Sequence, residues 1–191
     1  MPLKMPMLEG TLLGLADAAT ILAFYHRPAN PNARPMLPES GGPIRSVVIQ
    51  YVAGADFVLP IYRAFLSQEP ATVTAYIACP DPGDFHELQT ALGPVPPKLT
   101  PIFTHHLMTP WSRDRYLVLP PTAPDQCATL LAPQGERDAD IWPERAGDAA
   151  IASDLAAALP TSFIAQRSPL YFDGGDFLAD GPNLFVTRAL L

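Results

Sequence analysis

The chain has 191 residues, of which 48% are hydrophobic and 16% are charged, and its formal net charge is −7. This length is sufficient for one ordinary domain with a real core, and the composition excludes a disordered chain held open by charge. The acidic balance excludes a nucleic-acid binder built on a basic face. We expect a soluble globular protein whose field mildly favours cationic small molecules.

The first 43 residues form a region of their own. The segment Leu8–Phe24 predicts a helix, and the proline-rich segment His26–Pro43 predicts an irregular linker. Glu9 and Asp17 interrupt the apolar stretch and no clear cleavage site follows, which disfavours a secretory signal, and no apolar run reaches the roughly 18 residues of a transmembrane helix. We therefore expect a helix and linker over 1–43, one folded domain over 44–191, and a cytoplasmic, membrane-free protein.

From Ile44 onward, apolar segments typical of strands alternate with helical patterns on short connections, which indicates an α/β fold. The predicted strands are Ser46–Ala53, Ala71–Cys79, Leu99–Thr104, Tyr116–Leu119, Gln126–Ala132, Ser162–Ala165, Phe177–Ala179 and Leu184–Thr187. The predicted helices are Pro60–Gln68, Asp84–Leu92 and Asp148–Leu159. In the second helix, Asp84 and Glu87 have the spacing of a capping box and Gly93 marks the end.

The first motif that could carry chemistry lies in Thr109–Tyr116, between two predicted strands, where a loop would present its side chains to a cleft. It contains Trp111, Arg113 and Asp114. On residue types alone, an exposed Arg–Asp ion pair with a tryptophan filling the core is the favoured explanation of the pattern.

The second motif is Tyr171–Phe177, again between apolar segments. It holds Asp173, Gly174, Gly175 and Asp176, and two glycines flanked by aspartates are also ordinary turn chemistry. Calcium binding by these aspartates together with Asp180 is not expected, because their spacing does not match a calcium loop.

Together the two motifs resemble the Trp-x-Arg-Asp and Glu-Gly-Gly-Asp/Asn motifs of the superfamily of agmatine deiminases, arginine deiminases and amidinotransferases. The segment Phe177–Thr187, with Asp180-Gly181 at the expected turn, is similar to the hairpin that follows in that family. The resemblance implies a partial pentein fold, a β/α-propeller of which 44–191 would supply two to three of five blades. Its unclosed edges would favour self-association.

The resemblance also implies a chemistry. In this superfamily a cysteine thiolate attacks the guanidinium carbon, carboxylates hold the guanidinium nitrogens and a histidine moves protons. Paired carboxylates match the planar fork of a guanidinium, so Asp114 and Asp173 would bind a small guanidino compound such as agmatine or arginine, without metal or organic cofactor. Asp176 would support the loop. The residues expected at the substrate are Trp111, Arg113, Asp114, Asp173, Gly174, Gly175 and Asp176.

Two departures from the family pattern leave alternatives open. Deiminases usually have Glu where this chain has Asp173. The segment Phe172–Phe177 is similar to the Phe-Asp-x-x-Asp-Phe motif of amidinotransferases. Trp111 and the hairpin, in contrast, favour a deiminase of the agmatine type. The family's Cys and His would lie beyond Leu191. We therefore expect a deiminase-like hydrolase that is incomplete or inactive alone. The first alternative is an amidinotransferase, and the second is an inactive fragment that binds a guanidinium ligand or a partner chain. The third is a plain α/β module in which the two motifs are coincidental.

Four residues inside the chain are weaker candidates for the missing groups. Cys79 and Cys127 fit neither a disulfide framework nor a zinc site, and a buried structural thiol is the favoured interpretation for both. His105 and His106 precede the first motif and are interpreted as a solvated pair, because no partner is visible nearby in the sequence.

Overall fold

The computed structural model describes residues 36–37, 42–112, 115–123, 125–136, 139–180 and 183–186. The chain divides into two compact units, Met1–Arg34 and Pro35–Leu191, and every described residue belongs to the second. Several predictions lie outside the described residues: the helix Leu8–Phe24, most of the linker His26–Pro43, and Arg113, Asp114, Gly181 and Thr187.

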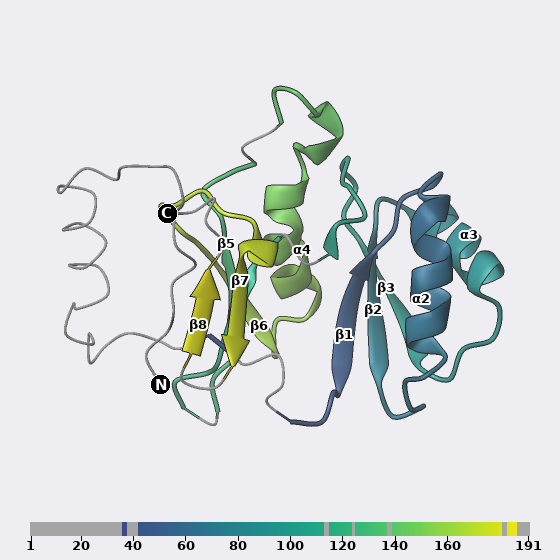
Figure 1. The fold of residues 1–191 in the computed structure, drawn as a ribbon, viewed down its shortest axis with the longest axis horizontal. Coiled ribbons are helices and arrows are strands. Elements are labelled where there is room, and N and C mark those ends of the chain that lie inside the picture. Colours follow the sequence, from purple (N-terminus) through teal and green to yellow (C-terminus); the bar gives the residue numbers. More distant parts are fainter. Residues whose placement is uncertain are drawn as a thin grey trace, which may run out of the picture. The chain divides into compact units, whose positions relative to one another are not determined.

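The first sheet contains three parallel strands in the order β1 (Ser46–Gln50), β2 (Thr74–Cys79) and β3 (Lys98–Phe103), shown at the right of Figure 1. The central strand β2 is apolar on both faces: Ile77 packs with one core, and its neighbour Ala78 packs with the other. A strand covered on both sides explains why this segment is continuously apolar.

Two helices, α2 (Leu59–Leu66) and α3 (Pro82–Leu92), provide the crossovers of the first sheet and cover one of its faces. Both predicted helices are confirmed, but the predicted start of α3 is wrong. Asp81, not Asp84, caps the helix, and its carboxylate accepts the N–H groups of Gly83 at 2.7 Å and Asp84 at 3.1 Å. Asp84 instead accepts the N–H of Ala53 at 3.0 Å.

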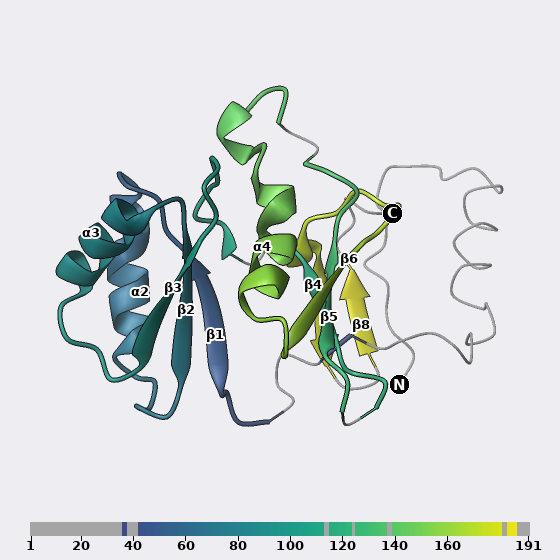
Figure 2. The ribbon, with the colours of Figure 1, turned by 180° about the vertical axis from the view of Figure 1, so that it is seen from behind.

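The second sheet has the order β4 (Leu117–Leu119), β5 (Ala128–Ala132) and β6 (Phe163–Arg167), with β4 antiparallel and β6 parallel to β5. Helix α4 (Ile151–Ala158) joins β5 to β6 and lies between the two sheets (Figures 1 and 2). Its Leu155 shares one core with Ala78 of the first sheet and Leu130 of the second. One helix therefore holds both sheets together.

Strands β7 (Phe177–Asp180) and β8 (Asn183–Val186) form a separate antiparallel pair, in which Leu178 is opposite Phe185 and Asp180 is opposite Asn183. This confirms the predicted hairpin, although its two connecting residues lie outside the described part. Phe177 also meets the ring of Phe172 edge to face, with centroids 5.5 Å apart. The aromatic contact joins the second motif to the hairpin that follows it.

The predicted α/β class is confirmed, with three small sheets and no closed barrel within the described ranges. The predicted strand Ser46–Ala53 ends earlier, at Gln50, because the chain turns at Val52, whose carbonyl accepts the N–H of Ala55 at 3.1 Å. Among the described residues, no helix has both the length and the apolar character that a membrane crossing requires.

The observed cap of α3 gives a direct test. Asp81→Ala removes the acceptor of two helix N–H groups, so the free energy of unfolding should fall by about 1 kcal/mol in urea titration. Asp81→Ser should restore most of that loss because a serine hydroxyl caps in the same way. Equal losses in both variants would contradict this assignment of the cap.

Candidate functional site

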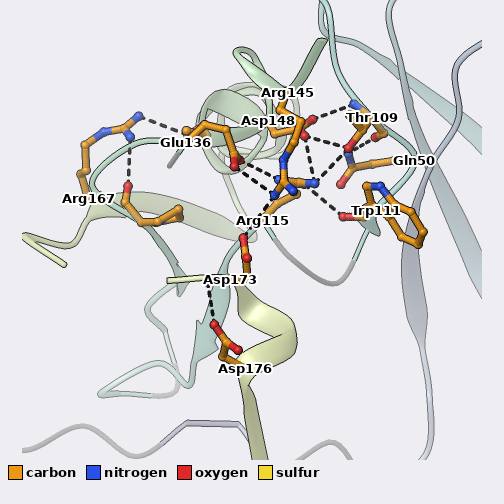
Figure 3. A network of polar contacts seen from close by, with 12 residues as sticks. Gln50, Thr109, Trp111, Arg115, Glu136, Arg145, Asp148, Arg167, Asp173 and Asp176 are labelled. Atoms are coloured by element: carbon orange, nitrogen blue, oxygen red, sulfur yellow. Dashed lines mark hydrogen bonds and ion pairs between the residues drawn. The ribbon is translucent and has the colours of Figure 1, made fainter. Parts of the chain in front are cut away.

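The side chain of Arg115, in the first motif, is only 1% exposed, although it carries a permanent charge. Its Nε donates to the carbonyl of Trp111 at 3.1 Å. Its two terminal nitrogens contact Glu136, Asp148 and Thr109, each at 2.9 Å. A buried guanidinium is tolerated only with such complete pairing, so these contacts fix the end of the loop (Figure 3).

Asp148 is fully buried and binds the beginning of the same loop. Its Oδ1 accepts the N–H of Thr109 and its Oδ2 accepts the Thr109 hydroxyl, both at 2.7 Å. Burial raises the pKa of Asp148, while the Arg115 guanidinium and the Thr109 donors favour its charged form. The charge of Asp148 therefore depends on the loop that it holds.

Glu136 connects the first motif to the second. Its Oε2 contacts Arg115 and its Oε1 contacts Nη2 of Arg145, both at 2.9 Å. The same Nη2 lies 3.4 Å from Oδ1 of Asp173. We call the series Asp148, Arg115, Glu136, Arg145 and Asp173 the ion-pair chain. Burial raises the pKa of Glu136, although both arginines favour its charged form.

The second motif forms a 3₁₀ turn, Gly174–Asp176, whose first residue is capped by Asp173. The cap is reciprocal: the Asp173 side chain accepts the N–H of Asp176, and Oδ2 of Asp176 accepts the N–H of Asp173 at 3.3 Å. The Asp173 side chain remains 47% exposed. It is therefore the member of the ion-pair chain that solvent reaches most easily.

Gln50, at the carboxyl end of β1, attaches the first motif to the first sheet. Its N–H donates to the Ser112 hydroxyl and its Nε2 to the Thr109 carbonyl, both at 2.7 Å. Its own carbonyl accepts the Tyr62 hydroxyl at 2.8 Å. The ion-pair chain thus holds the loop at both Thr109 and Arg115, and Gln50 of β1 adds contacts at Thr109 and Ser112.

A cleft of about 510 Å³ lies between β1 and β4. Its lining includes Ser112 and Tyr116 from the first motif, Gly174 from the second, and Ser46 and Val47 from β1. Burial raises the pKa of the Tyr116 hydroxyl, so Tyr116 remains protonated. Both motifs therefore face one cleft, whose volume suits a small molecule.

The structure places the described members of the predicted site as follows. Trp111 is 51% exposed and tilts against the ring of Phe57 at 6.0 Å, so it does not fill the core. Gly174 is buried and Gly175 is exposed. Asp173 and Asp176 lie in one turn. Arg113 and Asp114 lie outside the described residues, so the pairing of Asp114 with Asp173 stays a prediction.

Sequence reasoning missed most of the ion-pair chain. The sequence pattern assigns Arg115 no role within the first motif. It singles out neither its partners Glu136 and Asp148 nor Arg145, which pairs with Glu136. Asp148 was assigned only to a helix, which it does begin as part of the turn Asp148–Ala150. Isolated charges next to apolar segments are the available signal, but Glu136 is 21 residues from Arg115, and Asp148 is 39 residues from Thr109.

Neither cysteine lies in the cleft. Cys79 is fully buried in the first sheet, where burial raises the pKa of its thiol to about 12, so a buried structural thiol is confirmed. Cys127 is partly buried, and its Sγ lies 3.6 Å from the carbonyl of Pro160. No metal-binding group of His, Cys, Asp and Glu side chains exists within the described residues.

The interpretation of His106 as a solvated side chain without a partner is wrong. Its Nε2 contacts Asp154 of α4 at 2.8 Å, and its Nδ1 faces the Leu107 carbonyl at 3.0 Å. Both ring nitrogens therefore face acceptors, an arrangement that favours the protonated ring, which has two donors. Gly147 permits this contact, because a Cβ there would lie 1.9 Å from the Leu107 carbonyl oxygen and 2.2 Å from Nδ1 of His106.

Solved structures of deiminases share this fold. The chain is 13% identical to C. jejuni agmatine deiminase, with a TM-score of 0.56 and coverage of 83% of this chain and 47% of that one. A Cys-to-Ser variant of that enzyme with substrate bound is also 13% identical, with a TM-score of 0.56 and coverage of 78% of this chain and 44% of that one. A Porphyromonas gingivalis protein assigned as an arginine deiminase is 18% identical, with a TM-score of 0.52 and coverage of 81% of this chain and 47% of that one.

These similarities establish the fold, and they confirm at that level the resemblance predicted from the two motifs. The chain spans less than half the length of each of these structures, between 44% and 47%. No protein-family model and no curated protein matches the sequence.

The three contacts of Arg115 predict a strong response to a conservative change. Arg115→Lys keeps the charge but cannot reach Glu136, Asp148 and Thr109 together, so the free energy of unfolding should fall by about 3 kcal/mol in urea titration. The control Arg63→Lys, on the exposed side of α2, should change it by less than about 0.5 kcal/mol. Similar effects in both variants would argue against a central role for Arg115.

His106 predicts a pH-dependent contribution to stability. Burial lowers the pKa of His106, but the Leu107 carbonyl and the Asp154 carboxylate outweigh burial and raise it overall. A raised pKa in the folded state means that this stabilisation is complete below the ordinary histidine pKa of about 6.5 and is lost as pH rises through the folded pKa.

The variant His106→Gln should therefore be less stable than the native chain by under about 1 kcal/mol at pH 6, and the difference should shrink toward pH 8. Glutamine can still donate one hydrogen bond to Asp154 but does not titrate. Measuring both proteins by thermal denaturation across this range cancels the other titrating groups. A difference that grows with pH would exclude a charged His106.

Proposed function

We propose that this chain provides the guanidinium-binding part of an enzyme of the guanidine-deiminase type, which acts on a small cationic guanidine such as agmatine or arginine. The observation that carries the proposal is the ion-pair chain, which joins both motifs and ends at the half-exposed carboxylate of Asp173. Gly174, next to this carboxylate, and Ser112 of the first motif line the same cleft. A planar cation is the ligand that such a carboxylate suits best.

The proposal extends to the finer fold. The unit β4–β5–α4–β6 would be one blade of a pentein propeller, the first sheet a second, and the hairpin β7–β8 the beginning of a third. We propose the limits 44–191 for this deiminase-like domain. The cleft between β1 and β4 would then lie where neighbouring blades meet, which is where a shared binding site is expected.

The roles of the remaining motif residues are part of the same proposal. Asp114 would bind the second side of the guanidinium, with Trp111 and Arg113 beside the ligand, while Asp176 would keep Asp173 in place. The flexibility of Gly175 would allow close approach of the backbone. A thiolate that attacks the guanidinium carbon and a histidine that moves protons would come from outside the described residues.

A function limited to binding is favoured by one observation. Cys79 is buried with its pKa raised to about 12, and neither Cys79 nor Cys127 lines the cleft, so neither supplies a thiolate there. Within the described residues, ligand binding without turnover is therefore the expected behaviour.

The first experiment is calorimetric titration of the chain with agmatine and arginine, with an assay for ammonia or citrulline-type products run alongside. Asp173→Asn removes the exposed charge but keeps the size of the side chain, so the affinity should fall at least about tenfold, as expected for a lost charge-assisted bond. Asp114→Asn should give a similar loss.

The matched control is Asp125→Asn, the same change at an exposed aspartate that belongs to neither motif, which should leave binding unchanged. Binding that requires Asp173 without product would support a binding-only function of this chain, and product would support the full enzyme. Binding that is equal in all three variants, or absent from the native chain, would refute the guanidinium site.

A further inference from the structure

The guanidinium of Arg145 lies against the carboxylate at which the proposed function places a ligand guanidinium. Its Nη2 is 3.4 Å from Oδ1 of Asp173, and Figure 3 shows it directed toward that residue. A ligand guanidinium at Asp173 would present the same planar donor fork to the same acceptor. Arg145 and the ligand therefore compete for one carboxylate.

The contact between Arg145 and Asp173 is the easiest one of the ion-pair chain to break. It is longer than the other ion pairs of the chain, which all measure 2.9 Å. The Asp173 side chain is 47% exposed, whereas that of Glu136 is 5% exposed. A partly solvated pair contributes little free energy, so a ligand can displace Arg145 at small cost.

Arg145 retains a partner when this contact breaks. Its Nη2 also lies 2.9 Å from Oε1 of Glu136, a carboxylate held in turn by Arg115. Displacement therefore does not leave the Arg145 charge buried without compensation, which would otherwise oppose ligand binding. The pairing with Glu136 makes the competition reversible.

We propose that Arg145 acts as an internal competitor at Asp173, an autoinhibitory contact that a ligand guanidinium has to displace. This inference rests on the proposed function, because it assumes that Asp173 binds the ligand. A guanidinium displaces Arg145 by an exchange of like for like, whereas an ammonium is more strongly hydrated and lacks the planar fork. Because Arg145 lowers the fraction of the chain in which Asp173 is available to a ligand, it lowers the affinity for every cation by the same factor.

The test compares agmatine with putrescine, which has an amine in place of the guanidine, by calorimetric titration of the full chain. Arg145→Gln should bind agmatine about fivefold more tightly than the native chain, which is the effect of removing a partly exposed ion pair. The affinity for putrescine should rise by the same factor, because the preference of Asp173 for a guanidinium over an amine does not depend on Arg145.

Three further variants make the result interpretable. Arg145→Lys keeps a cation for Glu136 and should give intermediate affinities, and it serves if Arg145→Gln fails to fold in circular dichroism. The double variant Arg145→Gln with Asp173→Asn should lose the gain, because the competing group acts through Asp173. Arg63→Gln, which makes the same charge change on the exposed side of α2, should bind like the native chain.

The outcomes separate the two proposals. Tighter binding by Arg145→Gln that disappears in the double variant would support the internal competitor. Equal or weaker binding by Arg145→Gln, while native binding still depends on Asp173, would overturn the competitor and leave the guanidinium site intact. Absence of agmatine binding from both the native chain and Arg145→Gln would overturn both.

Discussion

The burial of one positive charge organises this structure. Arg115 cannot lose its proton in a protein, so its removal from water must be offset by the carboxylates and oxygens around it. Those partners come from three separate segments: Thr109 and Trp111 from its own loop, Glu136 from the segment after β5, and Asp148 from the turn before α4. Fixing this one side chain therefore fixes the relative positions of these three segments, and the first of them contributes Ser112 and Tyr116 to the cleft.

The sequence predicts the elements better than it predicts the site. Helices α2, α3 and α4 and the hairpin β7–β8 follow from periodicity and from end signals that lie within a few residues, such as Gly93 with its φ of +67°. The ion-pair chain depends on contacts that no local pattern records. Arg115 and Glu136 are 21 residues apart, Thr109 and Asp148 are 39 apart, and Gln50 and Thr109 are 59 apart.

The errors share a physical cause. The spacing to Glu87 favours Asp84 as the cap of α3, but Asp81 caps the N–H groups of Gly83 and Asp84, and the proline at position 82 favours this earlier start. The sequence shows no partner for His106 nearby, because Asp154 follows 48 residues later. In both cases the decisive competitor or partner was present in the sequence, and only the fold selects it. The fold, in turn, is shared with deiminases of which this chain covers less than half, so activity has to be argued from the site.

Gly147 limits which sequences can build this site. Its φ of −84° is ordinary for any residue, so it is required for the space it leaves and not for its backbone conformation. At a glycine with a positive φ, such as Gly54, asparagine is often an acceptable substitute. At position 147 it would not be, because the side chain has no space there. Even alanine would push the Leu107 backbone away from the turn that carries Asp148. A glycine directly before this aspartate is therefore a criterion for recognising other chains with the same arrangement, independent of the two motifs.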